Sequence, residues 1–449
     1  MIRLACTGLV ALVLSGCASF SEDGGFTPVA QLTQERTGLS PSYPRTAAQG
    51  DAAAARVAAL LQQPLTADSA AEIALLNNRA LQASYAELGI AEADRVRAGR
   101  LANPSFSFGR LNGAGAVEID RGVMFDLLGL LTLPVASQVE QERLVLTQLQ
   151  AADETVGLAA QARQAFFEAV AAQQLAGYQA QVKEAAEASN ALARKMVAAG
   201  NFSALDQMRE QAFSSEATVG LARAQHQAVA AREQLIRVLG LAGPQLDFTL
   251  PERLPDLPAA PVEPQDAEQT AMDQRLDIRM ARRSTEATAR SLGLTQATRF
   301  INVLNLGYQN KSTTGERLAQ GYQVELELPL FDFGATRAAR AEATYTQSLH
   351  RTAAIAVQAR SEVREAYSAY RTAYDLARHY RDEVVPLRKR ISEENLLRYN
   401  GMLISVFDLL ADARDQIAGV TGAVEALRDH WVAQTRLQTA LTGRSPNGL

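Results

Sequence analysis

The sequence has almost no cysteine. Only two of its 449 residues are cysteines, Cys6 and Cys17, and both lie near the N-terminus. We expect Cys6 to be removed with a signal segment, so the mature chain has neither a disulfide nor a thiolate metal site. The chain also has little excess of one charge over the other, since its formal net charge is only −5. A mildly acidic chain gives no reason to expect nucleic acid as a partner.

Motifs for chemistry are scarce as well. Three of the four histidines stand alone in the sequence: His226, His350 and His430. The fourth, His379, has Asp375 and Glu383 four residues away on either side. On a helix that spacing can hold a metal ion, but it more often marks a solvated, charge-paired face. With no nucleophile and no glycine-rich phosphate loop either, we predict that the protein is not an enzyme and has no cofactor and no metal site.

The N-terminus has an apolar run at residues 4–14, preceded by Arg3. This run is too short to cross a bilayer and has the length of the central part of a secretory signal. It ends in Leu14-Ser15-Gly16-Cys17, which is similar to the lipobox of bacterial lipoproteins. That resemblance implies a signal peptide over residues 1–16, lipidation of Cys17 and, because Ala18 rather than Asp follows, transport to the outer membrane. The alternative is an ordinary or uncleaved secretory signal with an incidental cysteine.

A short turn occurs twice in the chain, at Gly200 and at Gly401, which lie 201 residues apart. Each has Ala-rich, helix-favouring stretches on both sides, which predicts the tip of a helical hairpin. Other pairs keep the same offset: Arg163 with Arg364, Ala165 with Ala366, and Phe166 with Tyr367. The chain is therefore a duplication of a unit of about 200 residues.

Each half repeats one order of predicted elements: a helix, two strands, a long helix, a tip and a return helix. We expect the repeats to be residues 66–242 and 266–443, joined by a proline-rich extended linker at 243–265. Residues 17–65 show no sustained period and are predicted to be a tether from the lipid anchor, and 444–449 form a C-terminal tail. Thr66 or Asp68 is the expected N-cap of the first helix, which continues to about Arg100.

The long helices are expected at about residues 140–199 and 337–399. The first would be roughly 90 Å long, more than an ordinary domain core can cover, so it must run along a bundle or a barrel. In the second, apolar residues recur at steps of three and four: Val363, Tyr367, Tyr370, Tyr374, Ala377 and Val384. That period predicts coiled-coil packing, and Pro386 is expected to kink the helix.

The strands are predicted within residues 105–133, at 301–308 and at 322–330. In the first stretch Phe106 and Phe108 alternate with small polar residues, and the apolar run at 123–133 is expected to form a second strand. In the last, Val324 and Leu326 alternate with Glu325 and glutamine. This is the pattern of a barrel strand between lipid and water, although a surface sheet over an ordinary core shows it too. Four strands cannot close a membrane barrel, so several chains must contribute.

Taken in this order, the features resemble the TolC family of outer-membrane efflux channels. The resemblance rests on the lipobox, the duplication, the strand pairs, the two tips and the motif Leu328-Pro329-Leu330-Phe331-Asp332-Phe333-Gly334 before the second long helix. It implies a mainly α fold with a membrane β-barrel contribution, in which coiled-coil hairpins and four strands per chain build a trimeric tunnel. The twelve-stranded barrel would sit in the outer membrane, and the helices would extend into the periplasm.

The same resemblance implies a passive exit duct of a tripartite efflux system. Its partners would be two further copies of the chain, a periplasmic adaptor protein, an inner-membrane pump and the lipid of the outer membrane. The alternative is a pore-less periplasmic adaptor or scaffold lipoprotein with coiled-coil helices. Such an adaptor would be expected to carry one hairpin and a lipoyl-like β-domain, whereas this chain has two hairpins and two strand pairs.

Site residues follow from the same resemblance. In the family an acidic ring narrows the tunnel mouth; Asp408 occupies the matching position, with Asp412 one turn further on. The alternative is that Asp408 caps the return helix. The candidate adaptor-docking residues are those of the two turns: Gly200, Asn201, Phe202, Ser203, Gly401, Met402, Leu403 and Ile404. Alternatively, Leu403 and Ile404 only hold the two helices together. Gly401 and Asp408 are one residue further apart than Gly200 and Asp206, which suggests that the second tip is the one that moves.

Overall fold

The structure is a computed structural model that describes residues 19–113, 115–401 and 403–443. The chain divides into two compact units, and each unit takes residues from both halves of the sequence. The sheet unit comprises residues up to Val29, Ala83–Ala151 and Leu276–Val357. The hairpin unit comprises Ala30–Gln82, Ala152–Arg275 and the residues from Gln358 onward. Across the described ranges, no helix has both the length and the apolar character to span a membrane.

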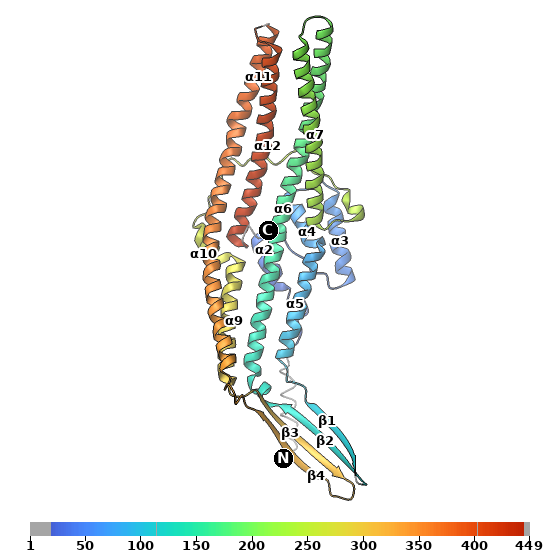
Figure 1. Ribbon diagram of the computed structural model, residues 1–449, viewed down its shortest axis with the longest axis vertical. Helices are drawn as coiled ribbons and strands as arrows, with labels where there is room; N and C mark the ends of the chain where they lie inside the picture. The colour runs from blue at the N-terminus through green and yellow to red at the C-terminus, as the bar shows by residue number, and fades with distance from the viewer. Residues whose placement is uncertain (1–18, 114, 402, 444–449) are drawn as a thin grey trace. The chain divides into compact units, whose positions relative to one another are not determined.

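The sheet unit contains one four-stranded antiparallel sheet in the order β1-β2-β3-β4 (Figure 1). Its strands are β1 (Ser105–Gly113), β2 (Ala116–Asp126), β3 (Val303–Thr313) and β4 (Ala319–Glu327). The first and second hairpins come from different halves of the chain, and β2 pairs with β3 to join them. Within the described residues, β1 and β4 each pair with one strand only, so the sheet is open at both edges.

The predicted second strand is too long. It ends at Asp126, and residues 127–133 instead begin helix α6 (Leu127–Ala198), which includes Pro134. Asp126 makes the change of structure possible, because its Oδ1 accepts a hydrogen bond of 2.7 Å from the Gly129 N–H, one of the unpaired donors of the new helix. The other strand boundaries differ as well: β3 continues to Thr313, beyond the predicted end at residue 308, and β4 stops at Glu327, before the predicted end at residue 330.

The motif between β4 and α10 (Ala335–His379) forms a tight turn against the end of α9 (Leu276–Thr298). Asp332 accepts a hydrogen bond from the Gly334 N–H (2.9 Å) and another from the Thr336 hydroxyl. Gly334 has a left-handed backbone, and a β-carbon there would lie 2.2 Å from the Arg299 carbonyl oxygen. Only glycine fits this position, which gives a physical reason for the last residue of the motif.

Residues 17–65 are not the irregular tether that we expected. In the described part they form α2 (Thr27–Thr37) and α3 (Ala47–Leu61), and Val57 and Leu65 are buried. Helix α4 (Ala67–Asn77) begins at the predicted N-cap Thr66, which forms a capping box with Ser69. The single helix expected up to Arg100 is interrupted at Asn78, and α5 (Arg79–Ala98) follows. Asn78 is extended and caps α5: its Oδ1 accepts the Leu81 N–H at 3.1 Å, and its side-chain amide donates to the Val238 carbonyl at 3.0 Å.

The second half has the same interruption. The predicted helix from Asp266 to Thr298 is divided into α8 (Ala267–Gln274) and α9 at Arg275, whose backbone is extended. Arg275 is fully buried and forms an ion pair of 2.8 Å with Glu362 of α10. A long-range contact therefore accompanies each break, and tertiary context overrides the helical propensity of both segments.

The hairpin unit contains two antiparallel helix pairs. The first is the distal part of α6 with α7 (Ala204–Leu239), and the second is α11 (Val385–Asn400) with α12 (Val406–Thr442) (Figure 1). Phe213 of α7 packs with Val182 of α6, and Ile417 of α12 lies against them. The guanidinium of Arg414 stacks over the Phe213 ring at 4.7 Å from its centroid. The two hairpins thus contact each other within this unit.

Pro386, which was expected to kink its helix, is preceded by a π-helical turn at Tyr380–Val384 between α10 and α11. Proline has no N–H to donate to the carbonyl four residues earlier. The backbone adopts the wider turn, in which the Val385 N–H donates to the Tyr380 carbonyl, five residues back.

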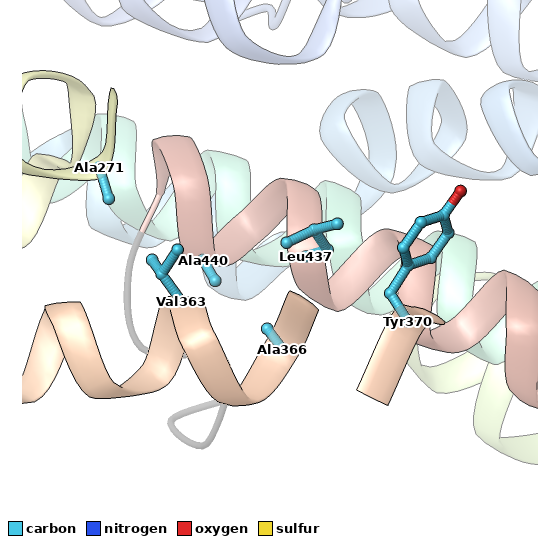
Figure 2. Close-up of a cluster of buried hydrophobic side chains, with 6 residues drawn as sticks. All are labelled: Ala271, Val363, Ala366, Tyr370, Leu437 and Ala440. Carbon is cyan, nitrogen blue, oxygen red and sulfur yellow. The ribbon is translucent and has the colours of Figure 1, made fainter. Parts of the chain in front are cut away.

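The predicted coiled-coil stripe of α10 is buried. Figure 2 shows Val363, Ala366 and Tyr370 of α10 facing Leu437 and Ala440 of α12, with Ala271 of α8 closing the cluster. Tyr374 and Ala377 continue the stripe in a second cluster with Leu257. Tyr367 is only partly buried, because Ala366 takes the central position beside it.

The proline-rich linker is extended after a short 3₁₀ turn at Gly243–Leu246, and it is tightly attached. The Tyr374 hydroxyl donates to the Pro258 carbonyl (3.1 Å), and the Trp431 indole N–H donates to the Pro255 carbonyl (3.1 Å). Tyr370 accepts a hydrogen bond from the Val262 N–H (2.7 Å). Aromatic side chains of α10 and α12 thus hydrogen-bond to backbone groups of the linker, which have no partner in a helix or a sheet.

Candidate functional site

The two faces of the sheet differ in chemistry. Successive residues of a strand alternate between faces, and directly paired residues share one. One row therefore crosses all four strands through Phe106, Val123, Tyr308 and Tyr322. The next row on the same face contains Phe125, Leu306 and Val324. These rows form what we call the apolar face.

The side chains of the apolar face are exposed. Phe106 is 78% exposed and Tyr322 is 83% exposed. Val324 and Leu326 of β4, Phe108 of β1 and Phe125 of β2 are exposed as well. Soluble monomers rarely leave an apolar area of this kind open, and larger exposed patches mark contacts with a membrane or another protein.

The opposite face, which we call the polar face, carries carboxylates at alternate positions of β2 and β4. They are Glu118, Asp120, Asp126, Glu325 and Glu327. Lys311 of β3 lies on this face and forms an ion pair with Glu118. The Asn305 amide donates to Glu325 at 2.9 Å across the β3–β4 pair. A sheet with one apolar and one acidic face suits a boundary between lipid and water.

Apolar exposure continues past the strands into the connections to the helices. Leu130 and Leu131 lie in the first turns of α6 and are exposed. Leu330, Phe331 and Phe333 are exposed in the turn before α10. The exposed apolar zone thus includes Leu130 and Leu131, which belong to the run at 123–133 that was expected to form a strand.

The two helical tips have the same cap. Ser203 accepts the Asp206 N–H at 3.2 Å, and Ser405 accepts the Asp408 N–H at 3.3 Å. The cap-to-aspartate spacing is identical, so the extra residue of the second copy precedes Ser405. Asp408 therefore corresponds to Asp206 of the first copy.

Asp408 completes a capping box. Its Oδ2 accepts hydrogen bonds from the Ser405 hydroxyl (2.7 Å) and the Ser405 N–H (2.9 Å). The bond from the hydroxyl has the larger effect, and together the two bonds lower the pKa of Asp408 below its ordinary value. The carboxylate is therefore ionised at neutral pH. The geometry is the helix-capping alternative, and the exposed carboxylate remains available to a solute or to a second copy.

Asp412 lies in a different environment from Asp408. It is 6% exposed, and neither carboxylate oxygen has a hydrogen-bond partner within the described residues. Asp408 and Asp412 thus lie one turn apart on α12, but the first is exposed and the second is buried.

Most of the expected docking residues lie at the surface. Gly200, Asn201 and Ser203 are exposed at the first tip, and Gly401 and Leu403 at the second. Leu403 is 77% exposed, so it does not hold the two helices together. Phe202 and Ile404 are half-buried. Met402 and the expected lipidation site, Cys17, lie outside the described residues.

Further apolar residues surround both tips and were missed in the sequence. Leu205 and Met208 are exposed at the first tip, and Leu396 and Leu397 at the second. They lie on helices α7 and α11, whereas the predicted docking residues were confined to the two turns.

The candidate metal residues of α10 form a charge-paired face. Asp375 pairs with Arg378 (3.4 Å) and Arg371 (3.9 Å), while His379 lies 3.3 Å from Glu383. Among the residues that the structure describes, no group of three or more His, Cys, Asp or Glu side chains is arranged to hold a metal ion.

His430, which stands alone in the sequence, is a buried polar residue in the structure. It is fully buried between the rings of Tyr370, Tyr374 and Trp431, with centroid distances of 5.2–5.6 Å. Neither ring nitrogen has a hydrogen-bond partner within the described residues. Burial lowers the pKa of His430 to about 4, so it is neutral at physiological pH.

The arrangement of strands and helices defines a known class of fold, that of outer-membrane channels, and the resemblance inferred from the sequence is confirmed at the level of the fold. The outer-membrane channel OprN is 19% identical, with a TM-score of 0.71 over 85% of this chain and 90% of that one. CusC, described as forming a transmembrane channel, is 18% identical, with a TM-score of 0.70 over 84% of this chain and 92% of that one.

A third solved structure with this fold is the open state of the MtrE outer-membrane channel of Neisseria gonorrhoeae. It is 16% identical, with a TM-score of 0.68 over 84% of this chain and 89% of that one. No protein-family model matches the sequence, and no curated protein matches it. At such low identities the likeness shows the fold alone.

Proposed function

We propose that the chain is a subunit of a homotrimeric outer-membrane channel of the TolC family. It would serve as a passive exit duct of an efflux system, without catalytic activity of its own. The duct would work with a periplasmic adaptor protein and an inner-membrane pump. Lipidation of Cys17 would anchor each subunit to the membrane.

The observation that carries this proposal is the open sheet with one exposed apolar face. Free strand edges cannot face lipid, since their N–H and C=O groups would have no partner there. Three copies joined edge to edge, β4 of one copy to β1 of the next, would satisfy both edges and give twelve strands. The apolar face would then contact lipid, and the acidic polar face would line water.

The adaptor-like alternative is less well supported. A coiled-coil scaffold in water would leave Phe106, Tyr322 and Val324 exposed to solvent on one sheet face, which is unusual for a soluble protein. The two alternatives differ in assembly. We expect the purified protein to migrate on a gel as an outer-membrane trimer that heating converts to a monomer. We also expect it to conduct ions in planar bilayers. A soluble monomer without conductance would rule out the channel.

The helical tips are the proposed adaptor-docking surface. Leu403 and its exposed neighbours Leu396, Leu397, Leu205 and Met208 offer apolar side chains that a partner can cover. Cysteine placed at Phe202 or Leu403 should crosslink to the adaptor protein in cells. No adaptor product from either position would remove this part of the proposal.

A gate at the tips is proposed for Asp408. In a trimer three exposed carboxylates near the axis would repel one another, and opening would relieve the repulsion. Asp412, which is only 6% exposed, would join such a ring only if the packing around α12 changed. Single-channel recording of Asp408→Ala tests the idea: unchanged conductance together with unchanged cation selectivity would leave Asp408 as a helix cap only.

A further inference from the structure

Two arginines interrupt the apolar face of the sheet near its turns. Arg121 of β2 lies directly opposite Phe108 of β1, and Arg110 follows Phe108 by two residues. Alternation therefore puts both arginines on the apolar face. They are diagonal neighbours across the β1–β2 pair, and such neighbours have their β-carbons about 7 Å apart.

Neither arginine has an acidic partner among the described residues. Arg121 makes only a long hydrogen bond of 3.5 Å to the Asn310 side chain, and Arg110 has none. The carboxylates of β2, Glu118 and Asp120, are on the polar face, where Glu118 is paired with Lys311. Both guanidinium groups are exposed. The two arginines thus concentrate positive charge beside aromatic and aliphatic side chains such as Phe108 and Ile119.

The position of the pair along the strands is specific. All four strands connect to helices at one end of the sheet, and the two hairpin turns are at the other end (Figure 1). The rows nearest the helices are apolar, through Leu304, Leu306 and Tyr308 of β3. The row of Phe108, Arg121, Asn310 and Gln320 is the first in which polar residues outnumber apolar ones, and in the next row Arg110 and Ser312 flank Ile119. The arginines thus mark the edge of the apolar band on the side of the turns.

From these observations we propose that Arg110 and Arg121 bind a phosphate group of a phosphorylated glycolipid in the outer leaflet of the membrane. This inference rests on the proposed function, because it requires the apolar face to be embedded in an outer membrane with the helices on the periplasmic side. The acyl chains of the lipid cover Phe106, Phe108 and Val123, and its phosphate reaches the level of the two guanidinium groups.

The chemistry fits an oxyanion with several acceptors. A guanidinium group offers paired N–H donors that match two phosphate oxygens, and it loses less hydration free energy on binding than an ammonium group. Two such groups on adjacent strands can hold one phosphate from two sides. An exposed aromatic ring beside each arginine, such as Phe108, suits the boundary between the acyl chains and the headgroups.

The experiment measures lipid retention by the assembled wild-type protein in detergent. Native mass spectrometry during titration with diphosphoryl lipid A gives an apparent Kd, and phosphatidylcholine and phosphatidylglycerol are titrated in parallel. We expect lipid A to bind more tightly than either phospholipid. In the variant Arg110→Gln/Arg121→Gln the affinity for lipid A should fall about thirtyfold, because each charge lost at a membrane surface weakens binding about fivefold.

The matched control is Lys311→Gln, which removes a cation at a similar level of the sheet from the opposite, polar face. It should change the affinity for lipid A by less than about twofold, a change within the range of ordinary surface substitutions. If the double variant does not assemble, the wild-type protein still tests the idea, because removal of the phosphates from lipid A should weaken binding to the same extent.

The outcomes separate the two proposals. Conductance with lipid A affinity that is insensitive to the arginines and to the phosphates overturns this inference and leaves the channel intact. Equal affinity for phosphatidylglycerol overturns the choice of a glycolipid. A wild-type protein that neither conducts nor enters membranes overturns the channel and the lipid site together.

Discussion

Arg163 of α6 pairs with Asp68 in the first turn of α4, with 2.9 Å between Nη2 and Oδ1. The same relationship occurs in the second half, where Arg364 of α10 pairs with Glu268 in the first turn of α8 at 3.1 Å. The duplication is therefore visible as a repeated ion pair between a long helix and a short one. The two copies differ in burial, since the Arg163 side chain is 17% exposed and the Arg364 side chain is 61% exposed.

This difference predicts unequal effects of mutation. Arg163 also donates to the Thr37 carbonyl of α2 at 3.2 Å, so Arg163→Ala loses a charged hydrogen bond as well as the ion pair. We expect it to lower the free energy of unfolding by about 1–3 kcal/mol. Arg364→Ala, at an exposed pair, should cost less than about 1 kcal/mol. Thermal unfolding of both variants in detergent tests this, and equal shifts of the midpoint would contradict it.

The caps of the two return helices predict a second result. Ser203→Ala and Ser405→Ala each remove the hydroxyl that accepts a backbone N–H, and each should destabilise the start of its helix by about 1 kcal/mol. Hydrogen exchange of the first turns of α7 and α12 measures this locally. Ser203→Thr and Ser405→Thr serve as controls, because threonine keeps the hydroxyl.

The capping carboxylate adds a pH dependence. The pKa of Asp408 is lowered by its bonds to Ser405, so its contribution to stability is complete above the ordinary value of 3.8 and is lost as the pH falls through the lower folded-state pKa. Exchange protection at the start of α12 should therefore decrease below about pH 4 in the wild type. In Asp408→Asn that pH dependence should be absent; its persistence would point to another group.

His430 predicts a loss of stability in mild acid. Its pKa is about 4 in the folded chain and 6.5 when exposed, so the unfolded chain takes up a proton first as the pH falls. Stability should decline between about pH 6.5 and 4, by up to about 3 kcal/mol in total. His430→Phe keeps an aromatic ring among Tyr370, Tyr374 and Trp431 and should remove this part of the pH dependence. Unfolding midpoints at pH 7.5 and 4.5 provide the measurement, and parallel curves would contradict the prediction.

The two sheet faces predict opposite tolerance to charge. Val324 and Gln323 are adjacent in β4 and lie on the apolar and polar faces. Val324→Arg puts a cation into lipid, at a cost of about 2–4 kcal/mol per subunit near the middle of the bilayer, so we expect little trimer in the outer membrane. Gln323→Arg should assemble normally. Quantifying heat-modifiable trimer in membrane fractions compares them, and equal assembly would argue against lipid on the face of Val324.

Local sequence patterns predicted the features that depend on near neighbours. Thr66 was identified as an N-cap, and Gly200 and Gly401 as hairpin tips, because caps and turns involve residues only a few positions apart. The alternation in β4 and the stripe through Val363 and Tyr370 were also correct in kind. Both follow from the fixed periods of strands and helices.

The predictions failed where distant residues decide. The apolar run at 123–133 fits either a strand or a buried helix, and it changes from one to the other at Asp126. The break at Asn78 combines a local cap of the Leu81 N–H with a bond to the distant Val238 carbonyl, and the break at Arg275 accompanies an ion pair with Glu362. Helices α2 and α3 are short, and each buries an apolar residue, Val29 and Val57 respectively.

The candidate sites divide in the same way. The sequence by itself determined that the chain is duplicated, that its long helices form hairpins, and that its strands have one apolar face, since each of these is a periodic property of the chain. Only the tertiary structure decided that Asp408 is a cap while Asp412 is buried, and that Arg110 and Arg121 are neighbours. Those facts depend on which strands and helices pair and in which register, and register is set by contacts between residues far apart in the sequence.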